Sequence, residues 1–117
     1  MKNQFFIFLL FFVITGCVQN EPTVTLINDS REKYDSVQVF SSAVLPTTFT
    51  DILPDEERSG KIHFDAKNQN DGAYGLKLYK GNEVIRSRYF GYYTNGASLN
   101  SNFTIRVESD TILVDEQ

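Results

Sequence analysis

Few side chains in this 117-residue chain could carry out catalysis or bind a metal ion. It contains one histidine, His63, and one cysteine, Cys17. A nucleophile activated by histidine needs a base and a carboxylate within reach, and a zinc site needs several histidine or cysteine ligands. His63 stands between Ile62 and Phe64, so strand alternation places it on the solvent face. We therefore expect no catalytic residue, no metal ion and no cofactor, and a protein that is not an enzyme.

A group of carboxylates surrounds Pro54. Asp51, Asp55, Glu56 and Glu57 could form an acid–base pair or an oxygen-ligand site for calcium. The spacing of a calcium-binding EF-hand loop is absent from the sequence. A charged turn between two strands is the simpler interpretation. A hydrolase would require these carboxylates to lie together in a cleft.

The single cysteine follows a segment that differs from the rest of the chain. Lys2 supplies a positive charge, residues 5–13 form an unbroken apolar run, and Thr15 and Gly16 are small residues just before Cys17. This order is typical of a secretory signal peptide, and the run is shorter than the roughly 20 residues of a membrane-spanning helix. With no second cysteine, Cys17 cannot form an intramolecular disulfide.

The residues Ile14-Thr15-Gly16-Cys17 resemble a bacterial lipobox, at which lipoprotein signal peptidase cleaves before a diacylated cysteine. The resemblance implies a signal peptide over residues 1–16, and a lipidated cysteine with a flexible tether over residues 17–22. It also implies a lipid anchor in the membrane of the cell envelope. Val18 occupies the place of an inner-membrane retention aspartate, which is similar to the outer-membrane class of lipoproteins. An ordinary secretory signal with an unrelated cysteine is the alternative.

The charge of the chain is acidic, with a formal net value of −4 at pH 7. Nucleic acids and anionic membrane surfaces attract basic proteins. The sequence therefore argues against a nucleic-acid partner and against membrane attachment through charge.

Residues 86–93, which read Arg-Ser-Arg-Tyr-Phe-Gly-Tyr-Tyr, form the most prominent candidate binding segment. Tyrosine and arginine are enriched at binding hot spots, and tyrosine rings can also stack on sugars. In the alternative interpretation, Tyr89 belongs to the core and the later tyrosines only cover one end of the fold. The predicted binding surface for a protein or glycan partner consists of Arg86, Arg88, Tyr92 and Tyr93.

Two tripeptides could mark sites of covalent modification. Asp35-Ser36-Val37 and Asp110-Thr111-Ile112 are similar to the sequon of periplasmic O-glycosylation in Bacteroidota. The resemblance implies sugars on Ser36 and Thr111. Strand starts are the alternative, because Asp, Ser and Thr are common there.

The elements that must position these residues are short alternating runs separated by turn residues, without an amphipathic helical stretch after the signal. They predict one all-β domain over residues 23–117, an antiparallel β-sandwich of seven or eight strands, immunoglobulin-like or of a related Greek-key type. The expected strands are 23–27, 34–41, 47–53, 61–66, 73–80, 83–90, 102–108 and 111–114.

Gly81-Asn82 is the clearest turn, because a two-residue loop of this kind favours a hairpin. The register that it predicts places Leu78 opposite Ile85 and Tyr74 opposite Tyr89. The opposite, solvent-facing side then carries Lys77, Tyr79, Val84, Arg86 and Arg88. The predicted core consists of Leu26, Val37, Val39, Ile62, Phe64, Leu76, Leu78, Ile85, Phe103, Ile105 and Val107.

The whole chain resembles the small β-sandwich lipoproteins common in Bacteroidota. That resemblance implies a non-enzymatic envelope lipoprotein, a membrane-tethered binding or assembly module for a protein or glycan. The alternative is an inhibitor or immunity-type lipoprotein against an envelope toxin or hydrolase, because its acidic charge would suit a basic target.

Overall fold

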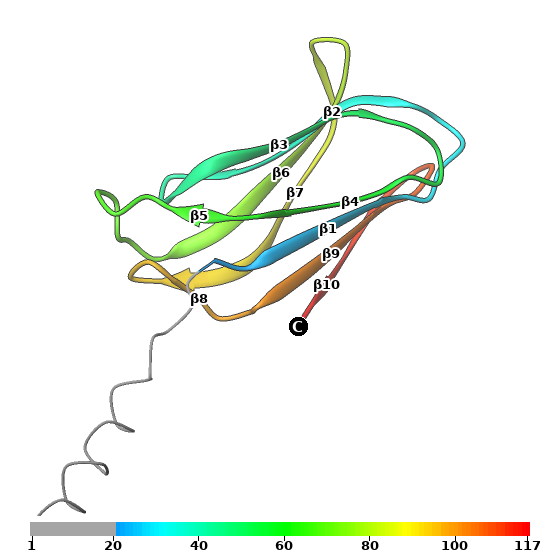
Figure 1. Cartoon of the computed structure of the whole chain (residues 1–117). Coiled ribbons are helices and arrows are strands. Elements are labelled where there is room, and N and C mark those ends of the chain that lie inside the picture. Colours follow the sequence, from blue (N-terminus) through cyan, green and yellow to red (C-terminus); the bar gives the residue numbers. More distant parts are fainter. Residues whose placement is uncertain (1–20) are drawn as a thin grey trace, which may run out of the picture.

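The computed structural model describes residues 21–117, so the predicted signal peptide, Cys17 and the tether up to residue 20 lie outside the described residues. Within that range the regular secondary structure consists of β-strands in two sheets that pack face to face (Figure 1). The predicted all-β sandwich is confirmed. Among the same residues, no helix is long and apolar enough to cross a membrane.

Two sheets of unequal size make up the sandwich. The smaller sheet contains β1 (Thr23–Asn28), β4 (Glu57–Lys61), β9 (Asn102–Val107) and β10 (Ile112–Glu116), in the order β10-β9-β1-β4. The larger contains β2 (Tyr34–Ser41), β3 (Val44–Ile52), β5 (His63–Phe64), β6 (Gly72–Lys80), β7 (Glu83–Thr94) and β8 (Ala97–Ser98), in the order β5-β3-β2-β6-β7-β8.

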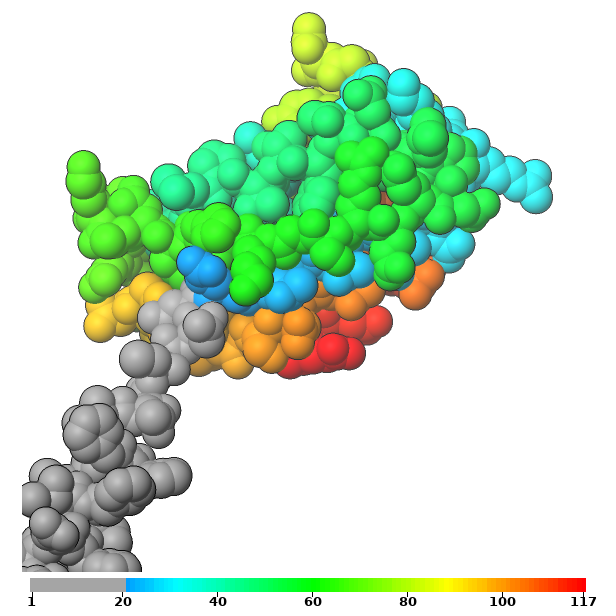
Figure 2. Space-filling view, viewed as in Figure 1, coloured from blue at the N-terminus to red at the C-terminus, as the bar shows by residue number. Residues whose placement is uncertain are grey.

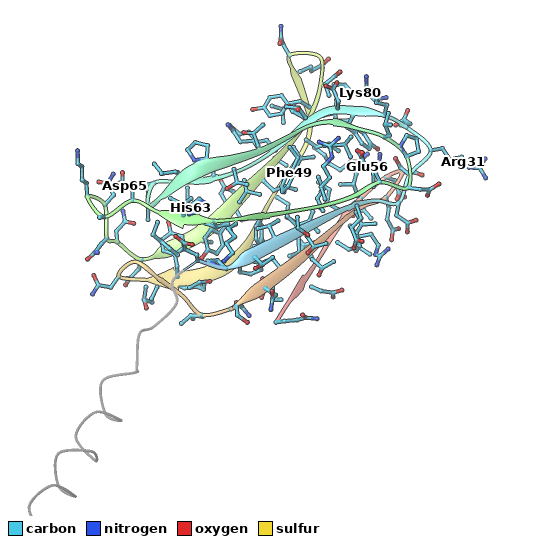
Figure 3. All side chains as sticks on the ribbon, viewed as in Figure 1. Arg31, Phe49, Glu56, His63, Asp65 and Lys80 are labelled. Carbon is cyan, nitrogen blue, oxygen red and sulfur yellow. The ribbon has the colours of Figure 1, made fainter. Side chains whose placement is uncertain are left out.

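The pairing is antiparallel except between β1 and β9, which run in the same direction. A parallel pair needs a long connection between its two strands, and most of the chain between β1 and β9 forms the larger sheet. The loops that connect the strands lie at the two ends of the sandwich (Figure 1). We call the end with residue 21, β5 and β8 the proximal end, and the end with the β6–β7 turn the distal end. In Figure 3, His63 and Asp65 lie at the proximal end, and Arg31 and Lys80 at the distal end.

The core lies between the sheets, where alternate side chains of each strand point inward. The predicted core is confirmed except at two positions. Phe64 is only partly buried and packs against the core, and Ile85 is 37% exposed. The other predicted core residues are buried: Leu26, Val37, Val39, Ile62, Leu76, Leu78, Phe103, Ile105 and Val107.

An aromatic cluster fills the proximal part of the core. Tyr74 lies at its centre, with ring centroids 5.1 Å from Tyr93, 5.3 Å from Phe103, 5.5 Å from Phe90 and 6.3 Å from Phe64. Tilted and edge-on arrangements of this kind add to the stabilisation from burial. Tyr74, Tyr93, Phe90 and Phe103 are buried.

The predicted strand 61–66 is in fact two strands in different sheets. β4 ends at Lys61 in the smaller sheet, and β5 begins at His63 in the larger one. Ile62 between them is fully buried, and its N–H donates to the carbonyl of Pro22 (2.9 Å). Pro22 is itself buried, so the packed domain begins before the predicted boundary at Thr23.

The predicted register of the β6–β7 hairpin is confirmed at its turn and wrong beyond it. Lys80 pairs with Glu83 as expected, but a β-bulge then places Leu78 opposite Arg86 instead of Ile85. One extra residue moves every later side chain of β7 to the other face. Ile85 is therefore outside the core, and Arg86 lies on the inward-facing side of the strand.

Candidate binding surface on the larger sheet

The larger sheet presents aromatic side chains to solvent across its middle strands. Tyr89 on β7 pairs with Gly75 on β6, and Gly75 pairs with Phe40 on β2. Residues opposite one another in antiparallel strands project to the same face, so Phe40 and Tyr89 share the outer face. We call this surface the aromatic face; it comprises Phe40, Lys77, Tyr79, Val84 and Tyr89.

Gly75 explains how Phe40 is seated on the aromatic face. A Cβ atom at Gly75 would overlap Cζ of Phe40, so the phenyl ring occupies the space above this glycine. The ammonium group of Lys77 lies 4.7 Å from the centroid of the same ring, within cation–π range. The ring is thereby held from below by the main chain and from one side by a cation.

Tyr89 is the most exposed aromatic side chain of the face. It is 73% exposed, against the prediction that it opposes Tyr74 in the apolar layer. The bulge at Ile85 accounts for this, because it pairs Tyr74 with Phe90 and turns Tyr89 outward.

The tyrosines of the predicted surface take opposite environments. Tyr92 is 56% exposed, whereas Tyr93 is 1% exposed and donates its hydroxyl hydrogen bond to Ser41 Oγ (3.0 Å). Tyr93 is therefore a core residue, and its place in the predicted binding surface is corrected. Gly91, with φ of 65°, lies in a second irregularity of β7 that turns Tyr93 inward.

The two arginines of the predicted surface bind main-chain oxygens across the side of the sandwich. Arg86 donates to the carbonyls of Glu108 (3.1 Å) and Ser109 (3.0 Å), in the turn between β9 and β10. Arg88 donates to the carbonyl of Ile112 on β10 (2.7 Å). They were predicted to face solvent with Lys77, but they connect the edge of one sheet to the edge of the other.

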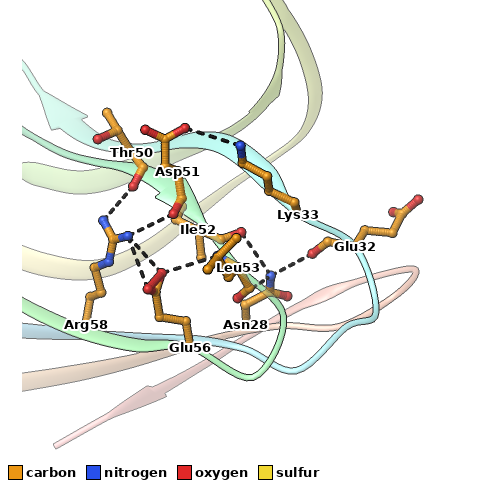
Figure 4. Close-up of polar contacts among 9 residues, drawn as sticks. All are labelled: Asn28, Glu32, Lys33, Thr50, Asp51, Ile52, Leu53, Glu56 and Arg58. Atoms are coloured by element: carbon orange, nitrogen blue, oxygen red, sulfur yellow. Dashed lines mark hydrogen bonds and ion pairs between the residues drawn. The ribbon is translucent and has the colours of Figure 1, made fainter.

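A third arginine also connects the two sheets, and Figure 4 shows its contacts. Arg58 on β4 donates to the carbonyls of Thr50 and Asp51 on β3, the latter at 2.8 Å. It also forms an ion pair with Glu56 (2.8 Å). Asp51 pairs with Lys33 instead (3.5 Å), so these two carboxylates have different cationic partners.

The remaining candidates for catalysis lie on the surface. Asp55 and Glu57 are exposed in and after the β3–β4 turn, and His63 is exposed, with Nδ1 3.1 Å from a carboxylate oxygen of Glu21. Within residues 21–117, no three His, Cys, Asp or Glu side chains are grouped to hold a metal ion.

Asn28 is a fully buried polar residue that orders the distal end (Figure 4). Its side-chain amide donates to the carbonyls of Glu32 (2.8 Å) and Leu53 (3.1 Å), and its Oδ1 accepts from Ser30 Oγ (2.7 Å). Its main-chain N–H donates to the main-chain carbonyl of Glu56 (2.9 Å). One side chain thereby joins the β1–β2 loop to the β3–β4 turn.

The predicted modification sites differ in access. Ser36 is half-buried in β2, between β3 and β6, whereas Thr111 is exposed in the turn between β9 and β10. A transferase needs its acceptor hydroxyl in an accessible segment, so Thr111 is the more reachable of the two.

Phe40 and Tyr89 are absent from the predicted binding surface, although both lie on the aromatic face. The sequence contains a signal for Phe40, since strand alternation places its side chain on the face of the strand opposite to that of the buried Val37 and Val39. A signal for Tyr89 lies in Val84-Ile85, two apolar residues in succession on a strand that otherwise alternates. Such a pair can indicate a bulge.

Comparison with protein-family models and with curated proteins gives no match. Among solved structures, the chain is similar to pneumolysin, with 11% sequence identity and a TM-score of 0.39. The similarity covers 83% of this chain and 23% of pneumolysin, so the chain spans less than a quarter of that protein's length.

Proposed function

We propose that this chain is a non-enzymatic lipoprotein of the bacterial envelope that binds a protein or glycan partner through the aromatic face. The observation that carries the proposal is the exposure of Tyr89 beside Phe40 and Lys77 on three hydrogen-bonded strands of the larger sheet. Single apolar side chains are common on protein surfaces, but aromatic rings on a rigid element supply contact area at a low cost in conformational entropy.

The mixed chemistry of the aromatic face suits either class of partner. An exposed tyrosine ring can stack on a sugar or enter a pocket of another protein, and its hydroxyl can form hydrogen bonds at the rim. Lys77 adds a positive charge to the surface of an otherwise acidic chain.

The lipid anchor is the second part of the proposal. The lipobox-like residues 14–17 support attachment through Cys17, and Val18 supports the outer membrane as the location. The sandwich contacts the chain from residue 21 onward, at the proximal end, through Pro22 and the Glu21–His63 pair. An anchor at Cys17 would therefore hold the proximal end near the bilayer and leave the aromatic face accessible from the side.

Cross-linking in intact cells, followed by mass spectrometry of the native membrane-bound protein, tests the binding surface. We expect the variant Tyr89→Ala to lose at least nine-tenths of the captured partner. Leu113→Ala is the matched control, because Leu113 is also exposed but lies on the smaller sheet. Undiminished capture by Tyr89→Ala would show that the aromatic face is not the binding surface. Capture of a toxin or hydrolase whose activity falls on binding would favour the inhibitor alternative.

Intact-mass measurement of the membrane-extracted protein tests the anchor and the modification. We expect a chain that begins at Cys17 and carries diacylglycerol, and we expect Cys17→Ser to release the protein from the membrane fraction. A glycan mass that disappears in Thr111→Ala would support the sequon at that residue. A soluble wild-type chain without lipid mass would refute the anchor.

A further inference from the structure

Most of the outer edge of β7 lacks a hydrogen-bonded partner strand. β7 spans Glu83–Thr94 and pairs with β6 along its length, but β8 pairs only with Tyr93 and Thr94. Within residues 21–117, β10 lies near β7 and is joined to it by the Arg88–Ile112 and Gly91–Glu116 hydrogen bonds, but no strand pairs with the edge of β7 between Val84 and Phe90. An exposed edge of this length can template pairing with another chain.

The direction of the main-chain groups along this edge follows from two hydrogen bonds. Gly91 N–H donates to Glu116 Oε1 (2.6 Å), and the carbonyl of Tyr92 accepts from Leu99 N–H (3.0 Å), so both groups point away from β6. Hydrogen bonds alternate between the two sides of an antiparallel strand. Every second residue before Gly91 therefore has the same orientation, so the N–H and C=O groups of Tyr89 and Ser87 also point away from β6.

Two other outer strands of the sandwich, β10 and β3, carry features that oppose edge pairing. Arg88 occupies the Ile112 carbonyl on the edge strand β10. β3 carries Pro46, and Arg58 occupies its Thr50 carbonyl. Proline and charged side chains are common devices against edge pairing.

The charge beside the edge selects the kind of strand that can pair. Arg86 and Arg88 lie on the inward side of β7 and bind carbonyls, and the ion pairs among residues 21–117 involve other cations. An added strand would place alternate side chains beside these arginines and the others beside Val84 and Tyr89. Acidic residues fit the first positions, and apolar residues fit the second.

We propose that the β7 edge between Val84 and Phe90 binds an extended strand of a partner protein in which acidic and apolar residues alternate. The proposal rests on the proposed function, since it specifies the class of partner. Glu116, bound at Gly91, limits the strand at the proximal end. A second copy of this chain is disfavoured as the occupant, because antiparallel pairing of two β7 edges would bring the Arg86 and Arg88 pairs together.

Hydrogen exchange of the full chain in detergent, read by NMR, tests the proposal with two peptides. The first is an end-capped seven-residue peptide that alternates valine and glutamate, and the second alternates valine and lysine. We expect the glutamate peptide to slow exchange of the Ser87 and Tyr89 amides at least tenfold, and the lysine peptide to leave it unchanged. Equal protection by both peptides, or by neither, would overturn the proposal.

A variant tests whether the main chain of the edge makes the contact. Ser87→Pro removes an N–H that points away from β6, and proline is tolerated on edge strands. We expect it to abolish protection at Tyr89 by the glutamate peptide, whereas Leu113→Ala retains it. Unchanged protection in Ser87→Pro, with its thermal transition intact, would place the contact elsewhere. If the variant does not fold, the comparison of the two peptides decides.

Two further outcomes separate this proposal from the proposed function. A dimer of the wild-type chain that dissociates in Ser87→Pro would identify a second copy as the occupant and overturn the acidic strand. Partner capture that depends on Tyr89, combined with no effect of either peptide, would leave the proposed function standing and refute the edge proposal.

Discussion

Asn28 shows how much of the distal end depends on one amide. It is fully buried, and its side chain bonds to Glu32, Leu53 and Ser30 in two separate loops. A buried polar group that loses its partner costs more than an ordinary hydrogen bond contributes. Removal of this side chain would deprive the carbonyls of Glu32 and Leu53, and the hydroxyl of Ser30, of their hydrogen bonds to Asn28.

We therefore expect Asn28→Ala to lower the free energy of unfolding by about 2 to 3 kcal/mol in denaturant titration. Asn102→Ala is the control, because the exposed Asn102 side chain contacts only the neighbouring Ser101 hydroxyl (3.3 Å). A surface change of this kind is expected within about 0.5 kcal/mol of the wild type. Equal stability of the two variants would contradict the role assigned to Asn28.

Tyr74 gives the core a dependence on alkaline pH. Burial raises the pKa of its phenol above the ordinary value of 10.0, and this outweighs the opposite effect of the Ser98 hydroxyl. The unfolded chain then releases the Tyr74 proton at a lower pH than the folded chain. Above pH 10 the folded state binds more protons, so the free energy of unfolding falls as pH rises.

The variant Tyr74→Phe lacks this titration. We expect its stability to fall less steeply than that of the wild type between about pH 10 and 11. Urea unfolding at several pH values in this range measures the two slopes, and the difference between them isolates Tyr74 from the lysines. Parallel slopes would mean that the phenol ionises equally easily in both states.

At the scale of elements, the arginines of β7 connect the two sheets through hydrogen bonds to main-chain carbonyls. We call this line of contacts between β7 and β10 the seam. Arg88 donates to Ile112 across the open side of the sandwich. Arg88→Met keeps most of the apolar stem and removes the donor. We expect it to lower the free energy of unfolding by about 1 kcal/mol.

Arg106→Met is the matched control for this seam, because Arg106 forms only an exposed ion pair with Asp29 (3.6 Å). Surface pairs of this kind contribute little. Calorimetry of both variants compares the seam with an ordinary surface contact. A larger loss for Arg106→Met would show that the bond to Ile112 is not stabilising.

β7 also shows where prediction from the sequence succeeded and where it failed. The alternation of apolar residues located most strands, and Gly81-Asn82 located the hairpin turn and its first pair, Lys80 with Glu83. The bulge at Ile85 depends on tertiary contacts, since it directs Arg86 toward carbonyls of a turn distant in sequence. Local alternation contains no information about those carbonyls.

The exposure of the tyrosines on β7 was predicted correctly at one position and wrongly at two. Tyr92 is exposed as expected, whereas Tyr93 is buried and Tyr89 takes its place outside. The register of β7 decides each of these outcomes, and two irregularities change that register within one strand. The tripeptide Tyr89-Phe90-Gly91 carries no local signal of which ring faces inward.

At the scale of the whole molecule, the two sheets share one core and should unfold together. Leu78 lies on β6 in the larger sheet and is fully buried. We expect Leu78→Ala to lower the free energy of unfolding by roughly 2 to 5 kcal/mol, with a single transition by circular dichroism and by tyrosine fluorescence. Leu113→Ala, at an exposed position, should change it far less. Separate transitions would contradict a shared core.

The two ends of the sandwich have different compositions. The proximal end holds the aromatic cluster beneath β5 and β8, and the distal end holds the polar network around Asn28. The tip of the β6–β7 hairpin, in yellow-green, projects from the top of the molecule in Figure 2. The point where the chain enters and the tip of the hairpin thus lie at opposite ends of the strands.

The parallel pairing of β1 with β9 has a mechanical consequence. Tension applied at residue 21 along the axis of β1 would act on a strand that β9 flanks on one side and β4 on the other. The hydrogen bonds of both ladders lie across that axis, so tension loads them in shear, all at once, instead of opening them one after another. Two ladders therefore hold β1, the first described strand, against such tension.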